Sequence, residues 1–372
     1  MRRIVLFCSD IYTSLGVIRC VGEGGNKVEV YCYGRECNYL LASRYVSTGK
    51  SFTKADDVVD YLINEYPIYE EKPVLLTIPD PPAYLVDLHK EVLESKFVVM
   101  SAGEAGAVIH WMSKVNISNL AVKYGLTVPW SITINKNNPI PNNLTYPVFT
   151  KSVKTMDGGK CDESICWNKA ELENKAKTIK GNDFLVMKYV LKEKEINYFG
   201  LALDGKIYID YHDERPRFKA GSYGHYNTFH RNEESSLLDN IKAMMLETGY
   251  NGLFDVEFIQ GKDGVLYFME VNFRIDGEVY KLLPGINYPM EWYRLINLKL
   301  SNQRLPDNLK LGKYNFTGMT ECSDFRENVV TGKLNPIVWF WQFLKADKHM
   351  LVNIQDPMPM LVKCKNMITR YF

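Results

Sequence analysis

Short apolar runs alternate with helix-length segments in the first part of the chain. The runs typical of buried strands are RIVLFC at 3–8, VEVYC at 28–32 and VLLTI at 74–78, and helical patterning covers 55–65 and 84–95. Strands with helices on both faces are continuously apolar, and parallel strands need a crossover connection that is usually a helix. The alternation therefore predicts an α/β fold, a doubly wound parallel-sheet domain that we place at residues 1–113.

The rest of the chain has a different pattern. After a loop rich in Asn and Pro, strand-like runs occur at 148–153, 184–190, 197–203 and 206–211, and a helix is expected over 233–247. Strands in succession indicate an α+β region.

A tight hairpin is predicted where two alternating runs, FDVEFI and VLYFMEVN, flank the turn signal GKDG. A turn at 262–263 would place Asp255 opposite Glu270, whereas a turn at 263–264 would place it opposite Asn272. Either register leaves these three polar residues on one face. The other face is expected to point into the core and carries Phe254, Val256, Phe258, Tyr267, Met269 and Val271.

Opposed carboxylates repel unless a cation lies between them. Mg²⁺ prefers oxygen ligands and is usually bound by one or two carboxylates, water and nucleotide phosphates. We therefore predict that Asp255, Glu270 and Asn272 hold Mg²⁺ or Mn²⁺, and that Glu257, on the same face, lies farther from Asn272. A solvated acidic face on an edge hairpin remains the alternative.

Two earlier stretches have the residue types that a nucleotide needs. In YPVFTKSVKTMDGGKC a strand lysine, Lys151, precedes Gly158 and Gly159, whose backbone N–H groups can approach phosphates. In FLVMKYVLKEKEINYF, the segment Lys188, Tyr189 and Val190 offers an apolar slot for adenine, and Glu195 offers a carboxylate for a ribose diol.

In this order, the motifs resemble the ATP-grasp superfamily over residues 1–300. The resemblance implies a Rossmann-like pre-ATP-grasp domain at 1–113 and a two-part ATP-grasp fold, with a small subdomain at 114–185 and a metal-binding subdomain at 186–310. It also implies that Lys151 and Lys188 contact phosphates and adenine and that Glu195 binds ribose. Arg274, in the pattern Glu-x-Asn-x-Arg, would steady the transferred phosphoryl group or the acyl phosphate.

The same resemblance extends to the reaction. The pattern Arg215-x-Arg217 before a glycine turn looks like the branch that contains D-aspartate ligase and related carboxylate-amine ligases. Such enzymes activate a carboxylate with ATP and join it to an amine. A single grasp module also resembles part of a carbamoyl-phosphate synthase large subunit, but the duplicated half of that enzyme is missing. Alternatives are an ATP-binding scaffold without turnover, and a carboxylase or carboxylate kinase whose acceptor is not an amine.

The composition of the chain limits which kinds of partner it is expected to bind. The net charge of +1 gives no field for nucleic acid, the longest strongly apolar segment is too short to span a bilayer, and the eight cysteines are scattered as expected for reduced thiols in the cytoplasm. We therefore expect small-molecule carboxylate and amine substrates. The C-terminal tail, residues 311–372, has an aromatic run that is expected to pack on the core or to form a homodimer contact.

Overall fold

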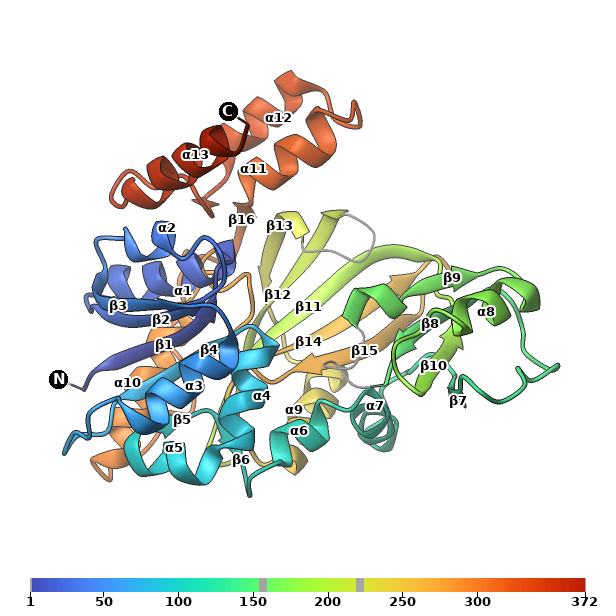
Figure 1. Ribbon diagram of the computed structural model, residues 1–372, viewed down its shortest axis with the longest axis horizontal. Helices are drawn as coiled ribbons and strands as arrows, with labels where there is room; N and C mark the ends of the chain where they lie inside the picture. Colours follow the sequence, from blue (N-terminus) through green and yellow to red (C-terminus); the bar gives the residue numbers. More distant parts are fainter. Residues whose placement is uncertain (1, 154–158, 219–223, 372) are drawn as a thin grey trace.

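The computed structural model describes residues 2–153, 159–218 and 224–371. Within these residues three main β-sheets are surrounded by helices. In Figure 1 the parallel sheet lies on the left, a large antiparallel sheet in the middle and a small antiparallel sheet on the right.

The parallel sheet has the strand order β3-β2-β1-β4-β5. Its strands are β1 (Ile4–Ser9), β2 (Val28–Tyr33), β3 (Val46–Phe52), β4 (Val74–Ile78) and β5 (Val98–Val99), and its helices are α1 (Tyr12–Glu23), α2 (Asn38–Leu41), α3 (Ala55–Asn64), α4 (Asp80–Leu88) and α5 (Lys90–Lys96). Alternate strand residues enter two cores, one against α1 and the other against α3, α4 and α5. The predicted doubly wound α/β fold is confirmed.

Two elements differ from the sequence prediction. Strand β3 has no apolar run because it is an edge strand whose side chains are mostly exposed. The single helix expected over 84–95 is two helices, since α4 begins at Asp80 with prolines in its first turn and ends at Leu88. Proline suits the first turn of a helix because the N–H groups there have no partner within the helix.

The small sheet has the order β7-β10-β8-β9. Its strands are β7 (Ser131–Asn135), β8 (Val148–Ser152), β9 (Ser164–Cys166) and β10 (Asp183–Lys188), and α8 (Lys169–Ala176) packs on it. Along β8, Val148 and Thr150 are buried, whereas Phe149 and Lys151 point to the opposite face. Period-two alternation thus directs Lys151 toward the large sheet.

The large sheet contains the predicted hairpin and runs in the order β15-β14-β11-β12-β13-β16-β17. Its strands are β11 (Lys192–Leu203), β12 (Lys206–Phe218), β13 (Gly224–Arg231), β14 (Tyr250–Gly261), β15 (Leu266–Asn272), β16 (Asn315–Met319) and β17 (Lys348–His349). The associated helices are α7 (Lys114–Lys123), α9 (Ser236–Thr248) and α10 (Tyr288–Leu300); α6 (Ala107–Trp111) precedes α7, and β6 (Ser101–Ala102) pairs with β14.

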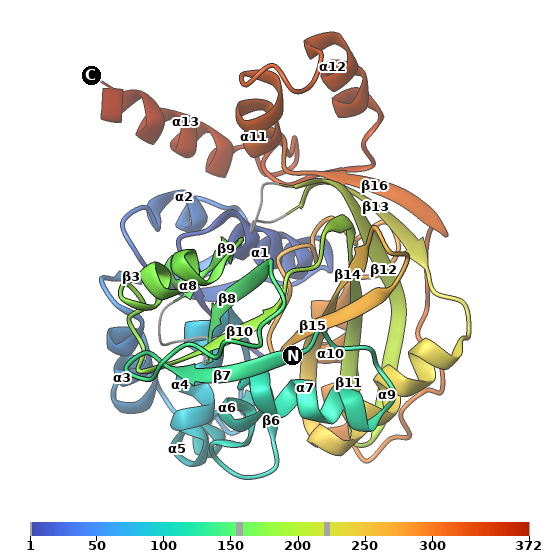
Figure 2. The ribbon, with the colours of Figure 1, turned by 90° about the vertical axis from the view of Figure 1, so that its right-hand side faces the viewer.

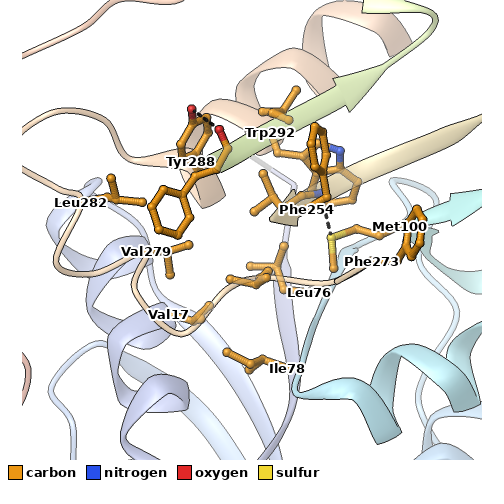
Figure 3. Close-up of a cluster of buried hydrophobic side chains, with 14 of the residues drawn as sticks. Val17, Leu76, Ile78, Met100, Phe254, Phe273, Val279, Leu282, Tyr288 and Trp292 are labelled. Carbon is orange, nitrogen blue, oxygen red and sulfur yellow. Dashed lines mark hydrogen bonds between the residues drawn. The ribbon is translucent and has the colours of Figure 1, made fainter. Parts of the chain in front are cut away.

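One hydrophobic core joins the parallel sheet to the large sheet. Val17 of α1 and Leu76 and Ile78 of β4 pack in the same cluster as Phe254 of β14 and Trp292 of α10 (Figure 3). Each fully buried side chain of this size contributes roughly 1.5–3 kcal/mol relative to exposure. The core therefore holds the end of β4 in a fixed position beside the hairpin.

The last part of the chain extends the large sheet and then forms helices at one end of the molecule (Figures 1 and 2). These helices are α11 (Glu321–Asp324), a π-helical turn at Phe325–Val329, α12 (Pro336–Lys345) and α13 (Met358–Tyr371). Helix α13 lies against α2. None of the helices in the described ranges combines the length and apolar character that a membrane crossing requires.

A buried ion pair fixes this segment to α1. Arg19 Nε donates to Asp356 Oδ2 at 3.1 Å, and both side chains are fully buried. Asp356 Oδ2 also accepts from Ser43 Oγ at 2.9 Å, and Oδ1 accepts from Arg44 N at 3.0 Å. A buried pair with its hydrogen bonds satisfied is tolerated, but a single buried charge is not.

We expect Asp356→Ala to lower the free energy of unfolding by about 3–5 kcal/mol, because it leaves Arg19 buried without a counter-charge. Urea unfolding followed by circular dichroism measures this loss. The control is Asp307→Ala, which removes an exposed partner of Lys206 and should cost less than about 1 kcal/mol. Equal losses in the two variants would contradict the structural role of the buried pair.

Candidate active site

The β14–β15 hairpin places four polar side chains in two cross-strand pairs. Asp255 is opposite Asn272, and Glu257 is opposite Glu270. This is the register that a turn at 263–264 predicts, so the alternative with Asp255 opposite Glu270 is wrong. The two carboxylates that face one another are therefore Glu257 and Glu270.

A three-residue turn and a β-bulge explain how the rest of the hairpin differs from the predicted pairing. The turn covers three residues, 262–264, and Gly264 has a φ of +79°, a conformation that favours glycine. A β-bulge beyond the paired glutamates shifts the register by one residue, so Phe258 faces Phe268. Phe268 is consequently buried in the core and Met269 lines a cavity, so the prediction that Met269 faces the core is wrong.

Asp255 does not line this cavity. Its side chain is fully buried, and Oδ1 accepts from Arg274 Nη1 at 2.9 Å. Oδ2 accepts from Asn272 Nδ2 at 2.9 Å and from Asn197 Nδ2 at 3.3 Å. In the ligand-free protein both carboxylate oxygens of Asp255 thus accept hydrogen bonds from Arg274 or from side-chain amides, and its contact with a metal ion stays a prediction.

Glu257 and Glu270 are the hairpin carboxylates that line the cavity. Lys151 Nζ, from the small sheet, lies 2.6 Å from Glu270 Oε2, and Asn272 Nδ2 donates to Glu257 Oε1 at 2.9 Å. Burial alone would raise the pKa of Glu270, but the charges of Lys151 and Lys114 lower it to about 2. Burial and the charge of Glu270 raise the pKa of Glu257 to about 7.

Lys114 is a member of this cluster that the sequence analysis did not assign. It is the first residue of α7, it is buried, and it lines a small recess with Asp80, Glu270 and Asn272. Burial and the charge of Lys151 lower the pKa of Lys114. A cation in the first turn of a helix opposes the helix dipole, and this unfavourable placement was the sequence signal for an anion nearby.

The cavity, about 540 Å³ in volume, lies between the small and the large sheet. This volume is within the range of small-molecule sites. Apolar side chains from both sheets form part of its wall: Phe149, Ile165, Met187, Leu191, Ile259 and Met269. Leu191 is 55% exposed although it is apolar, which suits a residue that covers a flat ligand.

The structure brings most of the predicted nucleotide residues to this cavity. Lys151, Lys188, Tyr189, Val190 and Glu195 all line it. Glu195 Oε1 accepts a hydrogen bond from Lys192 Nζ. The two predicted glycines do not belong to this set of lining residues. Gly158 is outside the described residues, and Gly159 begins the 3₁₀ turn Gly159–Asp162.

Lys188 also links the two sheets across the cavity. Its Nζ donates to Tyr267 Oη at 2.5 Å and lies 3.3 Å from Asp263 Oδ2. Lys188 is at the end of β10 in the small sheet, whereas its partners are on the β14–β15 hairpin. This contact and the Lys151–Glu270 pair are therefore two polar connections between the walls of the cavity.

Two of the predicted arginines, Arg274 and Arg215, pair with carboxylates in or beside the cavity wall. Arg274 Nε donates to Asp80 Oδ1 at 3.0 Å, and Arg215 Nε donates to Asp213 Oδ2 at 3.0 Å. Arg274, Arg215 and Asp80 all line the cavity. Arg217 pairs with Tyr226 through the backbone, but its side chain is outside what the structure describes.

No family model matches the chain, and no curated protein matches it. Among solved structures, an N5-carboxyaminoimidazole ribonucleotide synthetase in an ADP complex is similar, with a TM-score of 0.65 over 89% of this chain and 84% of that one. The chain has the ATP-grasp fold.

Two further structures agree with this ATP-grasp assignment. An L-amino acid ligase from Bacillus licheniformis matches with a TM-score of 0.60 at 15% identity, over 78% of this chain and 73% of that chain. Biotin carboxylase from Campylobacter jejuni, with bound nucleotide, matches with a TM-score of 0.63 at 13% identity, over 84% of this chain and 74% of that chain. The synthetase above is 14% identical, and identities at this level establish the fold alone.

The opposed glutamates give a prediction for the ligand-free protein. Glu257→Gln should raise the free energy of unfolding by about 0.2–1 kcal/mol in EDTA at mildly alkaline pH, because it removes like charge across the hairpin. The same change at Glu270 should lower it by about 1.5–3 kcal/mol, since Lys151 then loses the carboxylate that its Nζ contacts. Urea unfolding of both variants measures the difference, and a decrease of similar size in each would contradict the proposed electrostatics.

Proposed function

We propose that the protein is an ATP- and Mg²⁺-dependent ligase that activates a carboxylate as an acyl phosphate and joins it to an amine, releasing ADP and phosphate. One observation carries this proposal. The cavity is lined by apolar side chains, by Lys151, by the Glu257/Glu270 pair and by Arg274 and Arg215, and Lys114 lies in the small recess that shares Asp80, Glu270 and Asn272 with it. These groups suit the adenine, phosphates, metal and acidic substrate that such a reaction requires.

The nucleotide would bind between the two sheets. Adenine would fit the apolar slot beside Tyr189 and Val190, and Glu195 would accept hydrogen bonds from the ribose hydroxyl groups. Lys151 and Lys114 would hold phosphate oxygens. Lys151 has Glu270 as its counter-charge in the ligand-free protein, so the triphosphate would replace one anionic partner with another.

The hairpin chemistry fits Mg²⁺. No group of three or more His, Cys, Asp or Glu side chains in the described residues is arranged to hold a metal ion by itself. Glu257, Glu270 and Asn272 offer hard oxygens, with the remaining ligands expected from phosphate and water, which is the usual arrangement for Mg²⁺. When bound, the ion would neutralise phosphate charge during transfer.

The two arginines would act on the other substrate. The carboxylate oxygen attacks the γ-phosphorus, the bond to the bridging oxygen breaks, and ADP leaves. Arg274, held by Asp80 and Asp255, would orient the carboxylate and stabilise charge on the transferred phosphoryl group. The amine then attacks the acyl carbon, loses a proton, and phosphate leaves. Arg215 lies beside this position, and Arg217 follows it in the sequence.

The substrates are expected to be small molecules, and the supply of ATP favours the cytoplasm as the location. An ADP-release assay across amino acids and sugar acids, crossed with amine acceptors, tests the activity. An amide product with the mass of both substrates minus water supports the ligase. ADP release with an acyl phosphate or carboxylated product would favour a kinase or carboxylase. ATP binding without ADP release under all conditions would favour a scaffold.

Glu257→Gln should reduce the rate of ADP release by about 100-fold or more while the fold remains at least as stable, because one metal ligand is lost. Glu270→Gln should also abolish turnover. The control Glu193→Gln alters an exposed glutamate on β11 and should retain activity. Activity of Glu257→Gln equal to that of the control would contradict the metal site.

Glu195 can be tested with a modified nucleotide. We expect the unaltered protein to bind ATP roughly 10- to 100-fold more tightly than 2′,3′-dideoxy-ATP, the range for hydrogen bonds to a charged acceptor. In Glu195→Ala this ratio should fall to about one. Calorimetric binding of both nucleotides measures it, and an unchanged ratio in the variant would exclude the ribose contact.

A further inference from the structure

Helix α12 presents apolar side chains to solvent. Its sequence is PIVWFWQFLK, and none of its residues is buried. The outward side chains have large exposed fractions: Ile337 68%, Val338 45%, Phe340 52%, Trp341 58% and Leu344 55%. A helix that is apolar on all sides is normally covered, so this surface, which we call the α12 face, requires a partner.

The other side of α12 already has its contacts within the chain. The Trp339 ring stacks on Phe343 with a centroid distance of 5.5 Å and meets Phe325 edge-on at 5.0 Å. Phe343 also contacts His349. Figure 2 shows α12 at the outer end of the molecule, away from the sheets. Folding of this chain therefore uses only one side of the helix.

The charges around the α12 face are positive. Lys333 and Lys345 are exposed at its two ends, and no acidic residue occurs between Glu327 and Asp347. Asp347 is engaged, because its carboxylate binds Lys313 and the Thr317 N–H. From residue 326 to the end, the chain has seven basic and three acidic residues, and of the basic ones Lys348 and Lys363 are paired with Glu23 and Glu36.

We propose that the α12 face binds the surface of an anionic lipid bilayer. Trp, Phe, Ile and Leu on one side of a helix, with lysines at its margins, fit the boundary between headgroups and acyl chains. A helix of 10 residues is about 15 Å long, so it would lie in the interface rather than span it. This inference is independent of the ligase activity.

A second copy of the chain is a poorer occupant. A two-fold contact brings the same face of both copies together. The lysines of the two copies, Lys333 and Lys345, would then lie around one shared contact, and the α12 segment between Glu327 and Asp347 offers no carboxylate to offset them. Anionic phospholipid supplies the missing negative charge and also accommodates Trp341 and Phe340.

Flotation of the full chain with vesicles tests the proposal. Vesicles of equal parts phosphatidylglycerol and phosphatidylcholine should bind the protein at low ionic strength, and vesicles of phosphatidylcholine alone should bind it at least several-fold less. The tryptophan emission should shift to shorter wavelength on binding. Added salt should weaken binding, because exposed charges are screened.

Two sets of variants separate the apolar and the electrostatic contributions to vesicle binding. Trp341→Asp should lower the partition coefficient about tenfold or more. Lys333→Glu with Lys345→Glu should lower it roughly 25-fold on anionic vesicles, from about fivefold per basic residue removed. The matched control is Ile68→Asp, which alters an even more exposed apolar residue in the parallel-sheet domain and should bind as the unaltered protein does. Circular dichroism confirms that each variant is folded.

Absence of flotation with both vesicle types would overturn the proposal. It would also be overturned if sedimentation showed a dimer that Trp341→Asp dissociates while vesicles bind neither protein, because a second copy would then cover the α12 face. Equal loss of binding in Ile68→Asp would contradict a specific role of α12.

Discussion

Glu257 and Glu270 face one another across the β14–β15 hairpin, and their repulsion lowers the stability of the sheet unless a cation offsets it. In the ligand-free protein the offset comes from outside the hairpin, since Lys151 belongs to the small sheet and reaches Glu270 at 2.6 Å. The electrostatic requirement of one hairpin therefore also sets the position of the small sheet over the large one. The cavity lies between these two sheets, and the contacts of Lys151 with Glu270 and of Lys188 with Tyr267 connect its walls.

The opposed carboxylates of Glu257 and Glu270 are tolerated because other parts of the fold stabilise the protein. The core that contains Leu76, Phe254 and Trp292 joins the parallel sheet to the large sheet, and the buried Arg19–Asp356 pair adds the C-terminal segment to the same unit. Like charges that a fold has no structural need for usually mark a functional site. The expected gain in stability from Glu257→Gln expresses this conflict between folding and ligand binding.

The sequence was sufficient for the parts of the fold that depend on local pattern. Continuous apolar runs identified β1, β2 and β4, and the alternating hairpin was recognised with Glu270 and Asn272 on one face. The sequence could not identify the β-bulge, which moves Met269 into the cavity and depends on packing of Phe268 in the core. Nor could it distinguish Asp255 from Glu257, because both point to the same face, and only the position of Arg274 shows which carboxylate is already occupied. Lys114 was not assigned because its partner Glu270 is far away in the sequence.

Arg274 shows why the site requires the whole chain. Its guanidinium contacts Asp80 at the end of β4 in the parallel sheet and Asp255 on β14 in the large sheet. An arginine between two carboxylates from different sheets keeps a fixed direction, because each carboxylate restricts a different part of the guanidinium plane. If Asp80 moved with the parallel sheet, Arg274 would turn with it, and the cationic end of the cavity would shift relative to Glu257 and Glu270. The core between β4 and β14 therefore fixes the distance between Arg274 and the Glu257/Glu270 pair, which in the proposed reaction would lie on either side of the transferred phosphoryl group.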